Sequence, residues 1–203
     1  MDAAAWDARY EGAELVWSAE PNRFVAEQLA DLAPGRALDV ACGEGRNAVW
    51  LAGRGFAVTG VDFSTVALAK AHQLADASRV TVDWEPGDVT ESLPDGHFDV
   101  IVVAYLHLPG DAMAGLVARA AAALAPAGTL LLVGHHVDNP GEGYGGPQDV
   151  AVLHDHRVLA GLFADDAAYS VETAARVERP VTTDDGEVVA LDALVRVVRI
   201  ALD

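Results

Sequence analysis

The sequence predicts a single α/β domain in which an open, twisted and mostly parallel β-sheet has helices on both faces and a C-terminal antiparallel hairpin. Short runs rich in Val, Leu and Ala alternate with helical patterns through most of the chain, as expected for strands buried on both faces. A glycine-rich turn follows the first of these runs. Two apolar runs near the end are joined by Thr183-Asp-Asp-Gly186, which is a hairpin signal.

The elements follow one another at the short intervals typical of βα units. Turn signals at Pro34-Gly35, Pro94-Asp-Gly96 and Pro126-Ala-Gly128 precede three of the strands. We expect residues 1–34 to form a helical lid segment and 136–149 a flexible flap. The expected helices are residues 45–53, 64–77, 111–125 and 150–163. The expected strands are residues 36–41, 56–61, 79–84, 98–104 and 128–135, followed by 170–177 and 191–200 in the hairpin.

Composition narrows the class of protein. A length of 203 residues with 52% hydrophobic and 22% charged residues fits one globular domain, residues 1–203, as a monomer or homodimer. The net charge of −18 argues against nucleic acid as a partner, because phosphate contacts require Lys and Arg. One cysteine, Cys42, cannot form an internal disulfide. Without an apolar leader or a membrane-length run, we expect a cytoplasmic protein with no membrane partner.

A motif at the end of the first expected strand carries the main functional signal. Asp39 lies near the end of the strand, and Ala41-Cys-Gly-Glu-Gly45 follows before a helical pattern begins. Glycines at these positions allow unusual backbone conformations and let a ligand approach the main chain. The next strand runs into Asp62, whose carboxylate is placed to accept hydrogen bonds from a ribose diol. These two strand ends therefore predict a nucleoside cofactor at the carboxyl edge of the sheet.

A dinucleotide site is the alternative from another enzyme class. Gly43-Glu-Gly45-Arg-Asn-Ala48 satisfies G-x-G-x-x-A, and Asp62 lies 17 residues after Gly45, near the spacing of the NAD fingerprint. Against it, Asp39 would place negative charge near a pyrophosphate, and the chain leaves too little length for a substrate domain. An NAD-linked oxidoreductase therefore stays open as the second choice.

The stretch Asp39-Val-Ala-Cys-Gly-Glu-Gly-Arg-Asn47 resembles the cofactor loop of class I S-adenosylmethionine-dependent methyltransferases. It is especially similar to tellurite-resistance-type and related small-molecule (heterocycle) methyltransferases. The resemblance covers nearly the whole chain and implies a Rossmann-like fold, with S-adenosyl-L-methionine as methyl donor and S-adenosyl-L-homocysteine as product. That family usually has Gly at position 41, and Ala41 fits the turn only if its φ stays negative.

The resemblance also implies roles for individual residues. Asp62 would bind the ribose, Asp88 would accept a hydrogen bond from the adenine amino group, and Phe63 would pack on the adenine. Tyr10 and Trp17 either cover the cofactor and acceptor or anchor the first helix to the sheet. The full set of expected cofactor contacts is Trp17, Asp39, Ala41, Gly43, Gly45, Asp62, Phe63, Gly87, Asp88, Val89 and Ala104.

The acceptor side is expected after the fourth and fifth strands. Methyl transfer from a sulfonium depends on positioning and exclusion of water, with a base when the acceptor is a hydroxyl or amine. The candidate catalytic residues are Tyr105, His107 and His136, with His107 as general base or, equally, as a structural histidine. Tyr144 in the glycine-rich flap could stack on an aromatic acceptor.

Two histidine pairs, His135-His136 and His154-Asp-His156, contain residue types that bind zinc and similar ions. Adjacent residues of a strand point to opposite faces, so His135 and His136 would not share an ion. The two pairs also belong to different expected elements. We therefore predict no metal site.

The acceptor class is the least determined feature of the sequence. The tellurite-type relatives have a histidine just before the closing turn, whereas Arg179-Pro-Val-Thr-Thr-Asp184 has none. We therefore expect methylation of O, N or S on a small aromatic or heterocyclic compound. A metalloid or thiol methyltransferase of the same fold stays open, as does a non-catalytic S-adenosylmethionine-binding protein.

Overall fold

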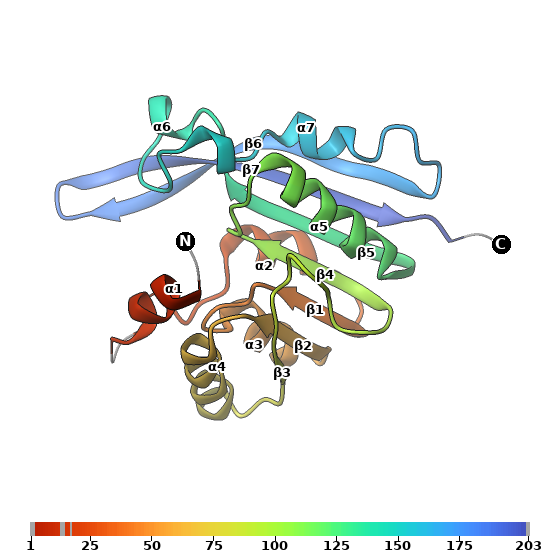
Figure 1. Ribbon diagram of the computed structural model, residues 1–203, viewed down its shortest axis with the longest axis horizontal. Helices are drawn as coiled ribbons and strands as arrows, with labels where there is room; N and C mark the ends of the chain where they lie inside the picture. The colour runs from red at the N-terminus through yellow and green to blue at the C-terminus, as the bar shows by residue number, and fades with distance from the viewer. Residues whose placement is uncertain (1–2, 13–14, 17, 202–203) are drawn as a thin grey trace.

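The computed structural model describes residues 3–12, 15–16 and 18–201. Seven strands form one sheet in the order β3-β2-β1-β4-β5-β7-β6 (Figure 1). The first five strands of this order are parallel, and β7 runs antiparallel to both β5 and β6. The strands are β1 (Arg36–Val40), β2 (Ala57–Asp62), β3 (Asp83–Pro86), β4 (Phe98–Ala104), β5 (Leu124–His135), β6 (Tyr169–Thr183) and β7 (Gly186–Arg199).

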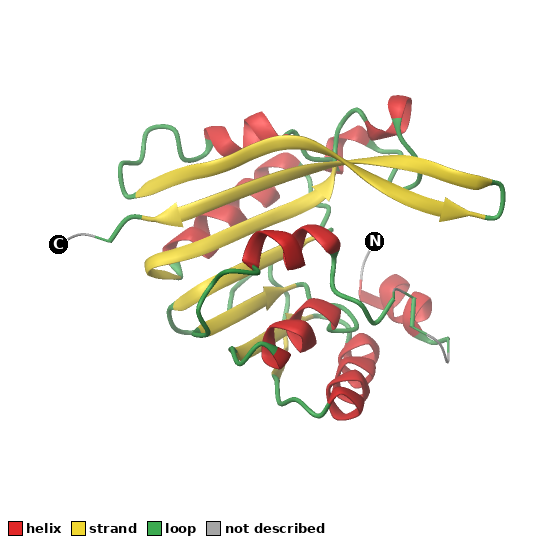
Figure 2. Ribbon diagram, turned by 180° about the vertical axis from the view of Figure 1, so that it is seen from behind, coloured by secondary structure: helices red, strands yellow, loops and turns green. Residues whose placement is uncertain are grey.

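Helices cover both faces of the sheet, as Figures 1 and 2 show from opposite sides. Helices α5 and α7 enclose one core with the sheet, and α2 and α3 enclose the other. Alternate residues of β4 serve the two cores: Ile101 belongs to the first and Val102 to the second. The helices are α1 (Ala3–Tyr10), α2 (Arg23–Leu29), α3 (Arg46–Gly53), α4 (Thr65–Ser78), α5 (Gly110–Ala122), α6 (Asn139–Glu142) and α7 (His156–Gly161), with a 3-10 helix at Val150–Val152.

The predicted fold class is confirmed, and several element boundaries differ from the sequence prediction, among them the start of β5 at Leu124 instead of residue 128. Strand β3 begins at Asp83, so residues 79–82 are not part of it. The single helix expected over 150–163 is divided into a 3-10 turn and α7, because His154 forms a parallel β-bridge with His136. Extended backbone at this bridge cannot be helical. Asp155 then restarts the helix by capping the backbone N–H of Arg157 at 2.8 Å.

The closing hairpin is longer than predicted and extends beyond the sheet. Strand β7 pairs with β5 as far as Asp192, opposite His135, while residues 186–191 pair with β6. Figures 1 and 2 show this distal part of the hairpin as an arm that projects past the end of β5. Among the described residues, no helix has the length and apolar character needed to cross a membrane.

Candidate active site

The loop between β1 and α3 has the backbone geometry of a ligand-binding turn. Gly43 and Gly45 have φ of 54° and 81°, and Gly45 lies at the N-cap of α3. A Cβ on Gly45 would lie 2.5 Å from the Trp84 ring, so this position has no room for a side chain. Ala41 also has a positive φ, 54°, which contradicts the expectation that its φ stays negative. The left-handed conformation that the turn requires here is imposed on an alanine.

Asp39 acts on the loop and the helix behind it. Its side chain is 1% exposed, and Oδ2 accepts a hydrogen bond from the backbone N–H of Ala48 at 3.0 Å. This bond satisfies one amide in the first turn of α3. Burial raises the pKa of Asp39 to about 7, against the smaller opposing effects of that bond and the charge of Arg46. The predicted role of Asp39, supporting the loop or binding the cofactor ammonium, stays a prediction.

Asp62 connects the ends of β1 and β2. Its two carboxylate oxygens accept hydrogen bonds from the backbone N–H of Gly43 at 2.8 Å and of Ser64 at 2.9 Å. Burial raises its pKa, and these two amides oppose the rise. An ionised carboxylate has about four lone-pair positions, so two remain for the hydroxyls of a ribose. The donor and acceptor chemistry at this strand end therefore fits a nucleoside.

Two further predicted cofactor positions, Gly87 and Phe63, adjoin Asp62. The Gly87 N–H donates to the Asp62 carbonyl at 3.0 Å, and Phe63 is partly exposed beside it. Asp88 is exposed, with Oδ1 accepting from the N–H and hydroxyl of Thr90 at 2.8 and 2.7 Å. Val89 is 2% exposed and packs in the core, so any cofactor contact there would be through its backbone. The roles of these positions stay predictions, and Trp17 lies outside the described residues.

The N-terminal segment lies next to the loop. Tyr10 is buried against Gly43, where a Cβ would come within 3.0 Å of the tyrosine hydroxyl. The Ser64 hydroxyl donates to Asp7 of α1 at 2.5 Å, and the backbone N–H of Val16 donates to Glu44 at 3.0 Å. These contacts are consistent with anchoring and with covering, so the lid role of residues 1–34 stays a prediction.

A polar network lies where β4 ends, next to β1 in the sheet. The Tyr105 hydroxyl donates to Asp192 Oδ2 at 2.5 Å, and Arg179 Nε donates to the same two groups at 2.9 and 2.7 Å. Burial and the charge of Asp192 raise the pKa of Tyr105, so the phenol keeps its proton. Burial alone would raise the pKa of Asp192, but its contacts with His135, Arg179 and Tyr105 prevail and lower it. The network is thus a neutral phenol between a guanidinium and a carboxylate.

Three imidazoles extend this network. The ring of His107 stacks on His135 and on His154, with centroids 5.4 and 5.2 Å apart. The backbone N–H of His135 donates to His107 Nε2 at 3.2 Å, which occupies that lone pair. Burial and repulsion from His154 and His135 lower the pKa of His107 to about 3. His107 is therefore a neutral ring in a stack, and its predicted role as general base is not favoured by this geometry.

The predicted flap packs against the network. Gly146 approaches His135 so closely that a Cβ would lie 2.6 Å from the ring. Asn139, fully buried, accepts from the Leu191 N–H at 2.7 Å and donates to the Gly145 carbonyl at 2.8 Å. The base of the loop is thereby tied to β7, while Tyr144 is 49% exposed. Opening and closure of residues 136–149 stay a prediction.

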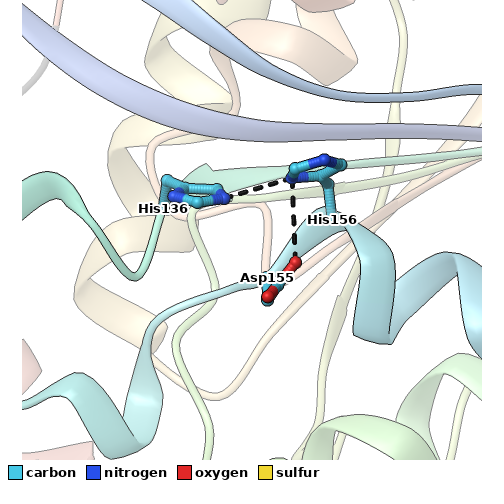
Figure 3. A group of neighbouring side chains, drawn as sticks. All are labelled: His136, Asp155 and His156. Carbon is cyan, nitrogen blue, oxygen red and sulfur yellow. Dashed lines mark hydrogen bonds and ion pairs between the residues drawn. The ribbon is translucent and has the colours of Figure 1, made fainter.

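His136 faces away from the Tyr105 network. Its Nε2 lies 3.1 Å from Nδ1 of His156, and the carboxylate of Asp155 is beside them (Figure 3). The two histidine pairs, His135-His136 and His154-Asp-His156, were expected in different elements. The β-bridge between His136 and His154 brings them together. The opposite orientations expected for His135 and His136 agree with these contacts.

Known proteins resemble this chain in sequence over part of its length and in fold over nearly all of it. Residues 37–128 match the family described as the methyltransferase domain. A chain from a structure on the conversion of a disulfide bond into a thioacetal group during echinomycin biosynthesis has a TM-score of 0.77 at 23% identity, over 99% of this chain and 93% of that one. TehB from Haemophilus influenzae has a TM-score of 0.71 at 15% identity, over 98% and 66%. Residues 37–128 thus match a methyltransferase domain, and the chain shares the fold of these solved structures.

A curated protein similar to part of this chain is a ubiquinone biosynthesis O-methyltransferase from Burkholderia ambifaria. It is 38% identical over 104 residues, which is 49% of this chain and 44% of the relative. The chain therefore spans less than half of the length of that curated relative. The matched region contains the loop at residues 41–45 and strands β1 to β4 with Tyr105 and His107, whereas His135, Arg179 and Asp192 lie beyond its end at residue 128.

Sequence reasoning missed several residues of the network around Tyr105 and of the loop that packs on it. Asp192 had a signal, because it is a lone acid inside the apolar run 188–195. Arg179 was noted only for the absence of a histidine in its segment. Asn139 and the partnership of His136 with His156 depend on pairing between distant segments, for which the sequence had no local pattern.

Proposed function

We propose that this protein transfers a methyl group from S-adenosyl-L-methionine to O, N or S of a small aromatic or heterocyclic acceptor. The observation that carries the proposal is the adjacency of two sites. Val40 pairs with Val103 in the sheet, so the loop at Ala41 and the network at Tyr105 begin at neighbouring strand ends. One site has the backbone and carboxylate for a nucleoside, and the other has polar side chains suited to an acceptor.

The bound cofactor would supply a methyl group already activated on a sulfonium. The chain would therefore contribute orientation and exclusion of water. Asp62 would fix the ribose through its remaining lone pairs, and the loop amides would hold the amino-acid end. Tyr105, held by Asp192 and Arg179, is the residue best placed to orient an acceptor, because its position is fixed from two sides.

Arg179 adds a preference among acceptors. Its side chain is 24% exposed, so part of the guanidinium can pair with an acceptor that carries a phenolate or carboxylate. An acceptor that is already anionic needs no general base from the protein, in keeping with the neutral, hydrogen-bonded state of His107. We therefore rank acidic phenols and heteroaromatic acids first within the proposed acceptor class.

The test begins with calorimetric titration of S-adenosylhomocysteine and NAD into the wild type, Asp62→Ala and Asp165→Ala. Asp165 is exposed on a surface turn and serves as the matched control. We expect micromolar binding of S-adenosylhomocysteine that Asp62→Ala weakens roughly 10- to 100-fold and Asp165→Ala leaves unchanged. If the wild type binds NAD but does not bind S-adenosylhomocysteine, the proposed methyltransferase activity is wrong.

A panel of phenols, heteroaromatic acids, thiols and tellurite then tests the acceptor. Turnover with the first two groups, lowered by Arg179→Gln, is the expected result. Turnover with thiols or tellurite alone would replace the proposed acceptor class with the metalloid or thiol alternative. Tight cofactor binding without turnover on any member would favour a non-catalytic cofactor-binding protein.

A further inference from the structure

The cluster of His136, Asp155 and His156 lies outside the proposed cofactor and acceptor sites. Backbone hydrogen bonds fix its two segments side by side: Val137 N–H donates to the His154 carbonyl at 3.0 Å, and His154 N–H to the His135 carbonyl at 2.9 Å. His136 is at the end of β5 and His156 begins α7, so both rings are attached to ordered backbone. Figure 3 shows the two rings approaching each other, with the carboxylate of Asp155 at their side.

From this arrangement we propose that His136, Asp155 and His156 bind one divalent transition-metal ion of the zinc type. Two nitrogens bound to zinc at about 2.0–2.1 Å in tetrahedral geometry lie roughly 3.3 Å apart. The distance between His136 Nε2 and His156 Nδ1 is 3.1 Å, close to that separation. One ligand atom from each of the three residues lies within 4.8 Å of the others. Small side-chain rotations would bring all three to one ion.

The third ligand keeps coordination capacity despite its structural role. Asp155 Oδ1 accepts from the Arg157 N–H and lies 3.8 Å from His156 Nδ1. A carboxylate has about four lone-pair positions, so capping α7 leaves positions for a cation. Two imidazoles and one carboxylate form a donor set that suits zinc and similar ions and suits Mg²⁺ poorly. With three protein ligands, the fourth position is left for water.

A carboxylate behind His136 supplies the orientation that metal-bound imidazoles use. The backbone N–H of Asp138 donates to Nδ1 of His136 at 3.1 Å, and Oδ2 of Asp138 lies 3.3 Å from the same nitrogen. An ion at Nε2 would require the imidazole proton on Nδ1, which would then donate to the Asp138 carboxylate in place of accepting from its backbone N–H. This carboxylate–histidine–metal arrangement recurs at zinc sites. Arg176 in turn holds Asp138 Oδ2 at 3.0 Å, which fixes the carboxylate.

The experiment uses the full chain, treated with a chelator and then titrated with Zn²⁺ by calorimetry and with Co²⁺ by visible absorption. His136→Ala and His156→Ala test the ligands, and His97→Ala, an exposed histidine elsewhere, is the matched control. We expect one Zn²⁺ per chain, weakened at least about 10-fold by either ligand variant and unchanged in the control. The Co²⁺ spectrum should be that of a four-coordinate ion and should disappear in His156→Ala.

Folding and specificity are controlled separately. S-adenosylhomocysteine binding and the thermal midpoint in chelator show whether each variant is folded, and His156→Gln replaces any variant that is not. The proposal is overturned by equal Zn²⁺ affinity in the wild type and the folded ligand variants, or by absence of Zn²⁺ binding to the wild type. A site that binds Mg²⁺ in preference to Zn²⁺ would also overturn it, because nitrogen ligands favour the reverse order.

Discussion

The phenol of Tyr105 and the carboxylate of Asp192 are joined by a hydrogen bond of 2.5 Å between residues 87 positions apart in the sequence. The bond connects the end of β4 to the middle of β7. It also gives fully buried Asp192 one of its partners, the others being Arg179 at 2.7 Å and His135 at 3.3 Å. The Tyr105 network is therefore assembled across the antiparallel insertion of β7, which brings a charge from the C-terminal hairpin to the carboxyl end of β4.

Asp192→Asn should lower the free energy of unfolding by about 3 kcal/mol, because it leaves Arg179 and its partners without a counter-charge in a buried site. Denaturant unfolding measures this change. Glu172→Gln is the control, since Glu172 pairs with Arg196 at 3.1 Å while 46% exposed and should cost less than about 1 kcal/mol. Equal effects of the two substitutions would contradict a buried charge network. Cofactor affinity should stay near the wild-type value in both.

Ala41→Gly should stabilise the protein. A left-handed conformation costs an L-residue about 1–2 kcal/mol, and the greater backbone entropy of unfolded glycine offsets about half of that relief. The expected gain is therefore about 0.5–1 kcal/mol, from the φ of 54° at Ala41. Ala69→Gly, at an exposed position within α4, provides the opposite case and should cost about 1 kcal/mol. Destabilisation by both substitutions in denaturant unfolding would show that Ala41 is not strained.

His107→Gln should separate the structural role of His107 from the catalytic one. The pKa of about 3 in the folded state lies below the unfolded value near 6.5, so the unfolded state binds more protons between these limits. By linkage, the stability that His107 contributes is present above about pH 6.5 and is lost as pH falls toward 3. The wild type should therefore lose more stability than His107→Gln on acidification from pH 6.5 to 4.5, measured by urea unfolding.

The same variant tests catalysis once an acceptor is known. Because the Nε2 lone pair of His107 already accepts from the His135 amide, we expect turnover within about 10-fold of the wild type. A loss greater than about 100-fold with intact cofactor affinity would instead establish His107 as the general base.

The predictable part of this protein is the part encoded locally. The loop from Asp39 to Gly45 and the strands β1 and β4 could be read from short patterns, because apolar runs and glycine spacing are local properties. The break before α7 was missed because it arises from a bridge between His136 and His154, which no local pattern contains.

Side-chain contacts around the Tyr105 network were missed for the same physical reason. Asn139 acquires its structural role by bonding Leu191, 52 positions away, and a glycine is required at position 146 by contact with His135. The sequence marked this loop as unusual and predicted a flap. Which atoms it contacts was decided by the tertiary fold.

Asp39→Asn should change how stability depends on pH. The folded pKa of about 7 lies above the ordinary value of 3.8, so the native state keeps a proton that the unfolded state loses between these limits. By linkage, this carboxyl lowers the free energy of unfolding as pH rises from about 4 to 7, by at most about 1.4 kcal/mol per pH unit. Asparagine keeps an oxygen to accept from the Ala48 N–H and has no such dependence.

The stability of Asp39→Asn relative to the wild type should therefore increase between pH 5 and pH 8 in urea unfolding, with Asp165→Asn showing a constant difference. A constant difference for Asp39→Asn as well would mean that the carboxyl is ionised throughout.

Cofactor affinity distinguishes the two predicted roles of Asp39. If Asp39 supports the loop through α3, the affinity for S-adenosylhomocysteine should change by no more than a few-fold. If Asp39 pairs directly with the cofactor ammonium, the affinity should fall about 10-fold or more, because a charge-assisted bond contributes about 1.5–3 kcal/mol. Because Asp39 already accepts a hydrogen bond from the Ala48 N–H, we expect the smaller change in affinity.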